Sequence, residues 1–216
     1  MTLEEYRQRY TAEDAVGWKC IDARLAKVYG ERAPRHYAAP VHFIAGGPDP
    51  LDGTSYYDRD NEPRHLHVVS YGLSELYYNE EAAGQEFSKT GFELTFRIKR
   101  NEGGTVEPTW VSVVMNNLAR YVHNSGRWFE ANQFVPAGGP LCTDMDTDIT
   151  GVVFALDPEL GRIDTPHGEV SFLQMVGITT AELSRLQTDP STEAVEKLIE
   201  ELRARDPLLV TDMERR

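Results

Sequence analysis

Two histidines with the spacing of a metal-binding pair lie in the first half of the chain. His65 and His67 are two residues apart in a segment rich in β-branched residues. Side chains two apart on a strand point to the same face, so both imidazoles could reach one ion. A third ligand would have to come from elsewhere, and an H-x-H pair without a second cluster is a weak zinc signal. Structural histidines are therefore the favoured interpretation, and a metal-dependent enzyme is the alternative.

An alternating acidic series offers further oxygen ligands. Asp144, Asp146 and Asp148 suggest calcium, but the glycine and terminal glutamate of an EF-hand loop are missing. A solvated loop edge explains these aspartates better. The sequence also lacks the Gly-x-Ser-x-Gly pattern, the phosphate-binding P-loop and the H-E-x-x-H zinc motif. We therefore predict no catalytic residue, no metal and no cofactor.

Aromatic side chains in the middle third give the remaining candidate site. The cluster consists of Tyr71, Tyr77, Tyr78, Trp110, Tyr121, Trp128 and Phe129. Most are expected in the core, yet tyrosine and tryptophan at the polar end of a helix are also typical of protein interfaces. The stretch from Tyr121 to Phe129 is therefore the predicted binding surface.

Strands are predicted from period-two alternation and from short apolar runs. In Phe92–Lys99 the apolar residues should face a core, while the polar set, which includes Arg97, should cover a wet face. The other predicted strands are Val41–Ile44, Leu66–Tyr71, Ile149–Leu156 and a hairpin of Arg162–Thr165 with Glu169–Val176. Their order predicts a mostly antiparallel or mixed sheet.

Helices are predicted from apolar residues at steps of three and four. The first should begin at Thr11 as N-cap, bury Trp18, Ile21, Leu25 and Val28, and end at Gly30. The others should begin at Pro108, at the Thr179–Glu182 capping box and at Asp189–Pro190. Helices beside such a sheet predict an α+β fold, with residues 1–216 forming a single compact domain.

Composition limits the class of partner. The chain has 216 residues, 40% of them hydrophobic, and 35 acidic against 22 basic residues give a net charge of −13. That charge repels a phosphate backbone, so we expect no direct nucleic-acid binding. No apolar run approaches a membrane span, and the acidic N-terminus lacks the pattern of a secretory signal, so a cytoplasmic protein without membrane contact is expected. The two cysteines, Cys20 and Cys142, should be mostly buried thiols.

Several segments together resemble a known family. They are Leu66–Tyr77, Gly91–Arg97, Pro108–Trp110, Asn117–Val122, Phe172–Gly177 and Leu208–Met213, in the order expected for the suppressor of fused domain. The resemblance runs from about residue 18 to 213. It implies a single-domain member of the kind found in bacteria.

The resemblance also implies a function. Animal members hold a transcription factor by clamping a short peptide strand, which implies binding by strand addition. Tyr121 matches a tyrosine of that peptide-binding surface, Phe129 lies on the same segment, and Gln133 falls where the animal protein has an aspartate. Some bacterial relatives are thought to be immunity proteins against toxins, which are often basic. We therefore predict a non-catalytic module that sequesters or neutralises a partner protein, with a self-associating scaffold subunit as a further alternative.

Overall fold

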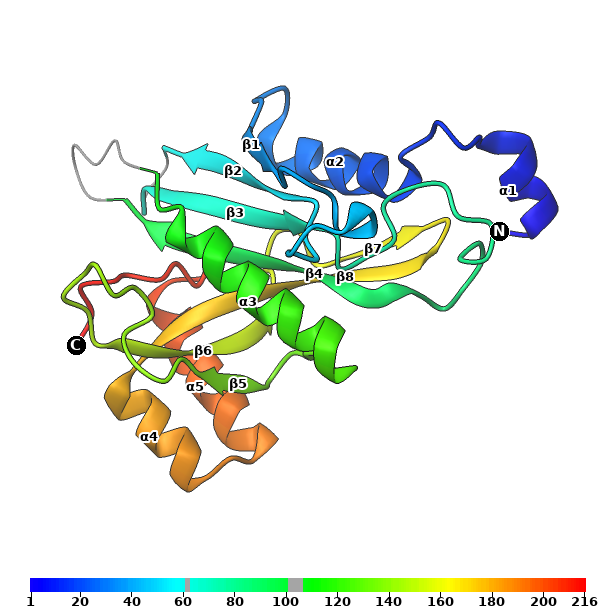
Figure 1. Cartoon of the computed structure of the whole chain (residues 1–216). Coiled ribbons are helices and arrows are strands. Elements are labelled where there is room, and N and C mark those ends of the chain that lie inside the picture. The colour runs from blue at the N-terminus through cyan, green and yellow to red at the C-terminus, as the bar shows by residue number, and fades with distance from the viewer. Residues whose placement is uncertain (61–62, 101–106) are drawn as a thin grey trace.

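The described part of the chain, residues 1–60, 63–100 and 107–216 of a computed structural model, folds around one mixed β-sheet (Figure 1). The strands are β1 (Arg35–Ala38), β2 (Gly53–Arg59), β3 (His65–Tyr71), β4 (Phe87–Lys99), β5 (Phe134–Pro136), β6 (Ile149–Leu156), β7 (Arg162–Thr165) and β8 (Gly168–Thr179). The helices are α1 (Leu3–Arg9), α2 (Val16–Tyr29), α3 (Trp110–Ser125), α4 (Thr180–Thr188) and α5 (Thr192–Arg205), with a short 3₁₀ helix at Phe43–Ala45. These elements confirm the α+β fold class.

The strand order is β1-β2-β3-β4-β8-β6-β5, and β7 pairs with β8 beside this path. Among the described pairs, β4 and β8 are parallel and the others are antiparallel. The sheet is therefore mixed, with β1 at one edge and β5 at the other.

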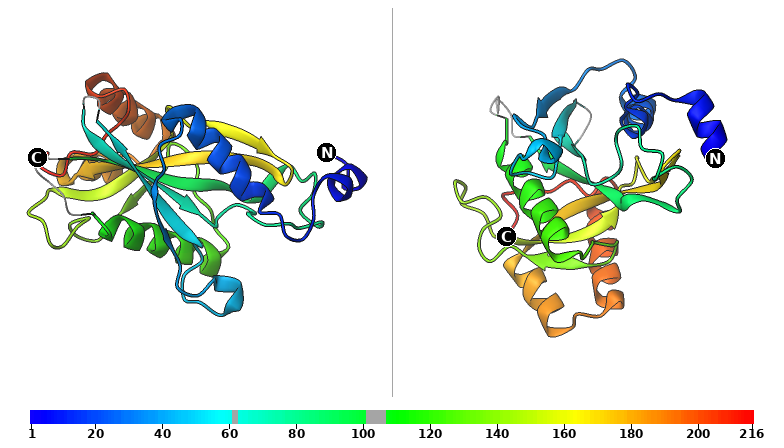
Figure 2. Two further views of the ribbon diagram at one scale, coloured as in Figure 1. Left: turned by 90° about the horizontal axis from the view of Figure 1, so that it is seen from above. Right: turned by 45° about the vertical axis from the view of Figure 1, so that its right-hand side comes forward.

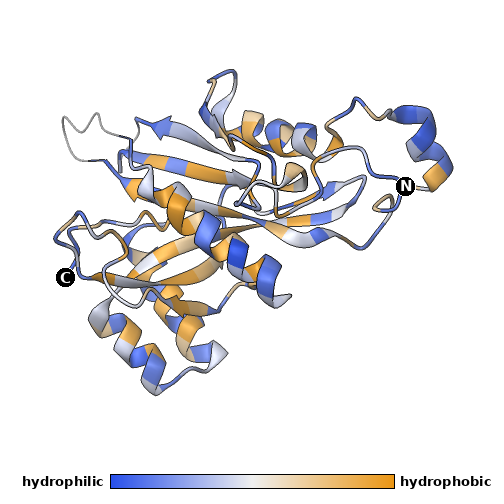
Figure 3. Cartoon of the chain, in the orientation of Figure 1, coloured by the Kyte–Doolittle hydropathy of each residue, from blue (hydrophilic) through white to orange (hydrophobic). Residues whose placement is uncertain are grey.

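Helices cover both faces of this sheet (Figures 1 and 2). On one side, called the α3 face here, α3 packs over residues such as Phe96. On the opposite α2 face, α2 packs over Val69, and α4 with α5 packs over Val176. In the hydropathy colouring, the central strands are largely apolar, while α4 and α5 also carry polar residues (Figure 3).

Most predicted elements are confirmed. The strands at Leu66–Tyr71, Phe92–Lys99 and Ile149–Leu156 form, and so does the β7–β8 hairpin. The capping box at Thr179 begins α4, where the threonine hydroxyl accepts a hydrogen bond from the Glu182 backbone N–H. Gly126 has a φ of 68° and ends α3.

One predicted strand and two predicted helix starts are wrong. Val41–Ile44 is not a strand, because a 3₁₀ turn begins at Phe43. Helix α2 begins at Val16 instead of after Thr11, since the backbone N–H groups of Gly17 and Trp18 donate to the Leu76 carbonyl. This approach requires glycine, because a Cβ at Gly17 would lie 1.9 Å from the Glu75 carbonyl oxygen. Helix α5 is capped by the hydroxyl of Ser191 instead of Asp189.

The predicted wet face of β4 is also wrong. Glu93, Thr95 and Arg97 are all 0% exposed, because the end of β3 with the turn after it contacts Glu93, and Asp157 after β6 contacts Thr95 and Arg97. Four donors from Ser70, Gly72 and Ser74 surround the Glu93 carboxylate at 2.5–3.0 Å. Burial raises the pKa of Glu93, and these donors oppose the rise.

The loop aspartates and the cysteines agree with expectation. Asp144 and Asp146 are exposed, while Cys142 is buried and Cys20 is partly buried. Within the described ranges, no helix combines the length and apolar character needed to cross a membrane.

Candidate functional site

An apolar groove of about 480 Å³ lies between α3 and the β5 edge of the sheet. Its lining residues are Val114, Asn117, Leu118, Tyr121, Phe129, Val135, Pro136, Ala137, Pro140, Leu141 and Val152. None of these side chains carries a charge. The groove can therefore bind apolar side chains, with few polar groups to orient them.

Helix α3 forms one wall because its apolar stripe is wider than the contact with the sheet. Val111, Met115 and Ala119 are buried against the strands. Val114, Leu118 and Tyr121 each directly precede a buried residue of α3, so they lie beside the buried stripe. Val114 and Leu118 are partly exposed, and Tyr121 is exposed. This flank faces the groove.

The structure brings two of the three predicted site residues together. Tyr121 is 44% exposed, and its ring stacks on Phe129 with centroids 5.6 Å apart. Phe129 is only 7% exposed and stacks in turn on Phe154 at 4.6 Å. Among the described residues, the Tyr121 hydroxyl has no hydrogen-bond partner, which leaves it available to a ligand. Tyr121 is thus the accessible member of the pair, and Phe129 supports it from below.

Gln133 lies just before β5 and is exposed, but it does not line the groove. Its side-chain oxygen accepts a hydrogen bond from the Glu130 backbone N–H at 3.2 Å. Alternation along the strand places Gln133 on the same face as Val135, which packs in the core of the α3 face. It therefore stands at the groove's end.

The edge strand β5 offers backbone groups beside this groove. Gln133 and Ala137 form backbone hydrogen bonds with Phe154 and Thr150 of β6, so alternation turns the N–H and C=O of Phe134 outward. Pro136, the next outward residue, has no N–H. A segment added at this edge can pair only over a short length, and the groove must supply the remaining contacts.

His65 and His67 lie on the α2 face and are both buried. Nδ1 of His67 is 2.6 Å from the Tyr29 hydroxyl, and Nε2 is 3.1 Å from Oδ2 of Asp157. Nδ1 of His65 is 2.6 Å from the Pro63 carbonyl oxygen. No group of three or more metal-ligating side chains occurs in the part of the chain that the structure describes. Both histidines have structural partners there.

Arg97 and Asp157 form a buried ion pair in the same region, which sequence reasoning missed. Both side chains are 0% exposed, and Nη2 of Arg97 lies 2.9 Å from Oδ1 of Asp157. Burial opposes ionisation of Asp157, but the neighbouring Arg97 and His67 hold its pKa well below the usual range. Burial lowers the pKa of His67 to about 4, so this imidazole is neutral at pH 7. The cluster stabilises charge inside the fold and has no opening to a substrate in the described contacts.

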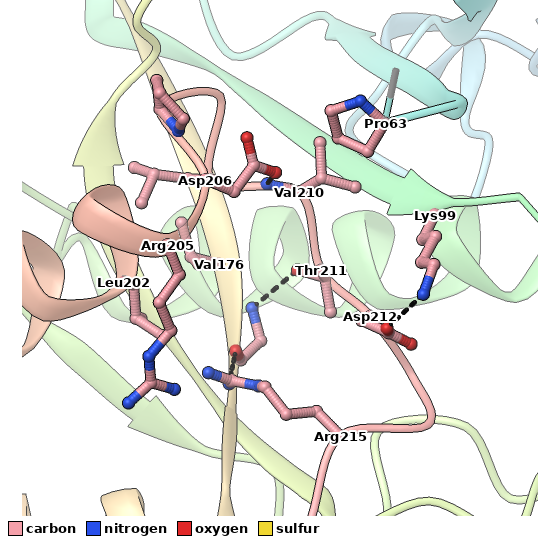
Figure 4. A pocket seen from close by; sticks show the side chains of 13 residues that line it. Pro63, Lys99, Val176, Leu202, Arg205, Asp206, Val210, Thr211, Asp212 and Arg215 are labelled. Atoms are coloured by element: carbon pink, nitrogen blue, oxygen red, sulfur yellow. Dashed lines mark hydrogen bonds and ion pairs between the residues drawn. The ribbon is translucent and has the colours of Figure 1, made fainter.

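A second pocket, of about 380 Å³, lies where the C-terminal segment docks on the sheet (Figure 4). Lys99 pairs with Asp212 at 2.6 Å, and Arg215 pairs with Glu182 at 2.9 Å. Thr211 also forms a parallel bridge with Ile98. These charged groups pair with one another. We therefore interpret the pocket as the contact region between the C-terminal segment and the sheet.

Comparison with known proteins identifies the family. A family model described as suppressor of fused protein (SUFU) matches residues 47–216. The chain belongs to the suppressor of fused family. The suppressor of fused homolog of Homo sapiens is 38% identical to it over 211 residues, which cover 92% of this chain and 43% of the human protein. This suppressor of fused chain thus spans less than half the length of the curated relative.

Solved structures of the suppressor of fused family share its fold. A chain in the crystal structure of the Sufu–Fu complex has a TM-score of 0.83 and 29% identity, covering 94% of this chain and 92% of that one. A suppressor of fused homolog from Neisseria gonorrhoeae has a TM-score of 0.62 and 17% identity, covering 93% of this chain and 95% of that one. The latter likeness shows the fold alone. The predicted family is confirmed, while the roles of Tyr121, Phe129 and Gln133 remain predictions.

Proposed function

We propose that this suppressor of fused chain is a non-catalytic protein-binding module that holds an extended segment of its partner between α3 and β5. The observation that carries the proposal is the coincidence of an apolar groove, an exposed Tyr121 and an open strand edge. One of the similar solved structures is that of the Sufu–Fu complex, which supports binding to another protein.

The recognition would combine two kinds of contact. The outward backbone groups of Phe134 would pair with the partner's main chain, and the groove would receive one or two of its apolar side chains. Tyr121 would be the central contact, because exposed tyrosines that pack on a rigid base are frequent hot spots. Gln133, at the end of the groove, would hydrogen-bond the segment as it leaves.

We propose further that the partner is basic and that the chain neutralises it, as an immunity protein in the cytoplasm of a bacterium neutralises a toxin. The support is the net charge of −13, which speeds association with a basic protein through a long-range field. The groove itself carries no charged side chain, so affinity and attraction would arise from different parts of the surface. The same field disfavours nucleic acid as a ligand.

The experiment is a quantitative pull-down from the source organism with matched baits. The baits are the wild-type chain, Tyr121→Ala and Tyr37→Ala. Tyr37 is 45% exposed on β1, at the opposite edge of the sheet, and therefore controls for loss of an exposed tyrosine. We expect one stoichiometric partner with wild type and Tyr37→Ala, and at least a tenfold loss with Tyr121→Ala, equivalent to about 1.4 kcal/mol or more.

Retention of the partner by Tyr121→Ala would place binding elsewhere. Absence of any partner, in cells shown to express the neighbouring genes, would count against the binding module and favour the alternatives. A self-associating subunit would then show concentration-dependent oligomers. A metal enzyme would show stoichiometric zinc that is lost in His65→Ala or His67→Ala.

A further inference from the structure

A third pocket, separate from the two described above, lies at the β1 edge of the sheet, on the α2 face. It has a volume of about 440 Å³ and lies between α2, the loop after it, and strands β1 and β2. Trp18, Asp22, Ala26 and Tyr29 line it from one side of α2, at helical steps of four, four and three. His36, Ser55 and Tyr57 form the opposite wall.

Aromatic rings make the walls of this pocket rigid. The Trp18 indole stacks on Tyr71 with centroids 4.4 Å apart and meets the edge of His36 at 5.1 Å. Tyr57 stacks on Tyr29 at 4.2 Å. Stacking on Tyr71 uses one face of the indole, and Trp18 is also among the residues that line the pocket. Electron-rich ring faces of this kind attract cations.

An exposed carboxylate, that of Asp22, lies beside these rings and lacks an ion-pair partner within the described residues. Oδ1 of Asp22 accepts a hydrogen bond from the Tyr71 hydroxyl at 2.8 Å. The Asp22 carboxylate acts on Tyr57 in the pocket wall. Burial raises the pKa of Tyr57 to about 12, and the negative charge of Asp22 adds to the rise. The pocket thus holds an uncompensated negative charge next to aromatic faces.

The other titratable groups leave that charge in place. Glu31 at the pocket's end is exposed and adds a second negative charge. Arg32 is the one arginine or lysine in the lining, and its Nη1 is held by the Asp58 carbonyl at 2.6 Å and by the Asp60 carboxylate at 3.1 Å. Burial lowers the pKa of His36, whose Nδ1 lies 2.9 Å from the Ser55 hydroxyl, so the imidazole is neutral at pH 7.

We propose that this pocket binds the guanidinium group of an arginine side chain presented by a partner protein. A guanidinium is planar and weakly hydrated, so it can lie against Trp18 while it donates hydrogen bonds to Asp22. An ammonium is a point charge with a tighter hydration shell and uses the ring faces less well. The site lies at the β1 edge and does not depend on binding at the α3–β5 groove.

The test is a titration of the isotope-labelled chain with N-acetyl-arginine amide, followed by NMR at the tryptophan indole N–H signals. The chain has three tryptophans, and Trp18→Phe identifies the signal of Trp18. We expect a saturable shift of the Trp18 indole, with the indoles of Trp110 and Trp128 unchanged. The citrulline derivative, which has the same shape without the charge, should not shift it, and the lysine derivative should bind several-fold more weakly.

Two variants complete the experiment. Asp22→Asn keeps an acceptor for the Tyr71 hydroxyl but removes the charge, and it should weaken arginine binding about tenfold. Asp144→Asn, an exposed aspartate far along the chain with no role in the lining, should leave the affinity unchanged. Equal binding of arginine and citrulline, equal binding of arginine and lysine, or an unchanged affinity in Asp22→Asn would each overturn the proposal. The ligand comparison on the wild-type chain decides the matter even if Asp22→Asn does not fold.

Discussion

Replacing Arg97 by methionine tests whether the buried ion pair matters to stability. The Arg97 guanidinium donates to both oxygens of Asp157, at 2.9 and 3.1 Å, and neither side chain has any exposed surface. Methionine fills a similar volume but leaves the carboxylate of Asp157 without its cation. Removing one partner of a buried pair in this way costs about 3–5 kcal/mol. We therefore expect Arg97→Met to lower the free energy of unfolding by about that amount.

A double-mutant cycle separates the charge from the packing. Asp157→Asn in the Arg97→Met background removes the uncompensated charge, while the amide oxygen in the place of Oδ1 keeps an acceptor for the backbone N–H groups of Glu159 and Leu160. The double variant should therefore be less destabilised than the two single changes together, by about 1–3 kcal/mol. Urea unfolding followed by circular dichroism and by tryptophan fluorescence gives all four values.

The pH dependence gives an independent check. In the wild type the lowered pKa of Asp157 contributes stability that is present at neutral pH and is lost as the pH falls through its folded-state pKa. In Arg97→Met, burial without a cation raises the pKa of Asp157, so protonation relieves the penalty in acid. The difference between wild type and variant should shrink from pH 8 to pH 5. A cost below about 1 kcal/mol, or simple additivity in the cycle, would refute this reasoning.

Two further predictions use the same unfolding assay. Phe129→Ala should lower the free energy of unfolding by about 3–5 kcal/mol, because the ring is buried on Phe154. Tyr121→Ala should lower it by about 1 kcal/mol, because that side chain is 44% exposed. Equal losses in the two variants would contradict this assignment. Between pH 6.5 and 4 the unfolded chain takes up a proton at His67 that the folded chain excludes, so the unfolding free energy should fall across that window, by up to about 3 kcal/mol. His67→Gln should flatten this fall, and His123→Gln, exposed on α3, should leave its slope as in the wild type.

Local patterns were enough to predict the long elements but not what covers them. The alternation in Phe92–Lys99 predicts a strand with one apolar face, and that face is in the core. It cannot show that Arg97 is buried, because its partner Asp157 lies 60 residues later in the sequence. Strand β2 was missed because its polar sequence, Gly53–Arg59, shows little alternation and is buried through contacts with β1, β3 and α2.

The candidate sites show the same limit. Helical spacing and the family resemblance pointed to Tyr121, but Leu141 and Val135 complete the groove from a loop and an edge strand that local propensity does not predict. At the other edge, Trp18 was expected as a core residue; helical spacing places Asp22 beside it, but the pocket forms only because His36 of β1 supplies the opposite wall. Helix α1 was not predicted, although Thr2 and Glu5 have the spacing of the capping box that begins it.

The parallel pairing of β4 with β8 governs when the chain can fold during synthesis. Phe96 pairs with Met175, about 80 positions later in the sequence, so the centre of the sheet closes only after Met175 has left the ribosome. Until then β4 is an unpaired apolar edge, the kind of surface that seeds aggregation and recruits chaperones. The bridge between Ile98 and Thr211 extends this dependence to Thr211. Production of shortened chains should therefore give insoluble material even when every helix and both proposed sites are encoded intact.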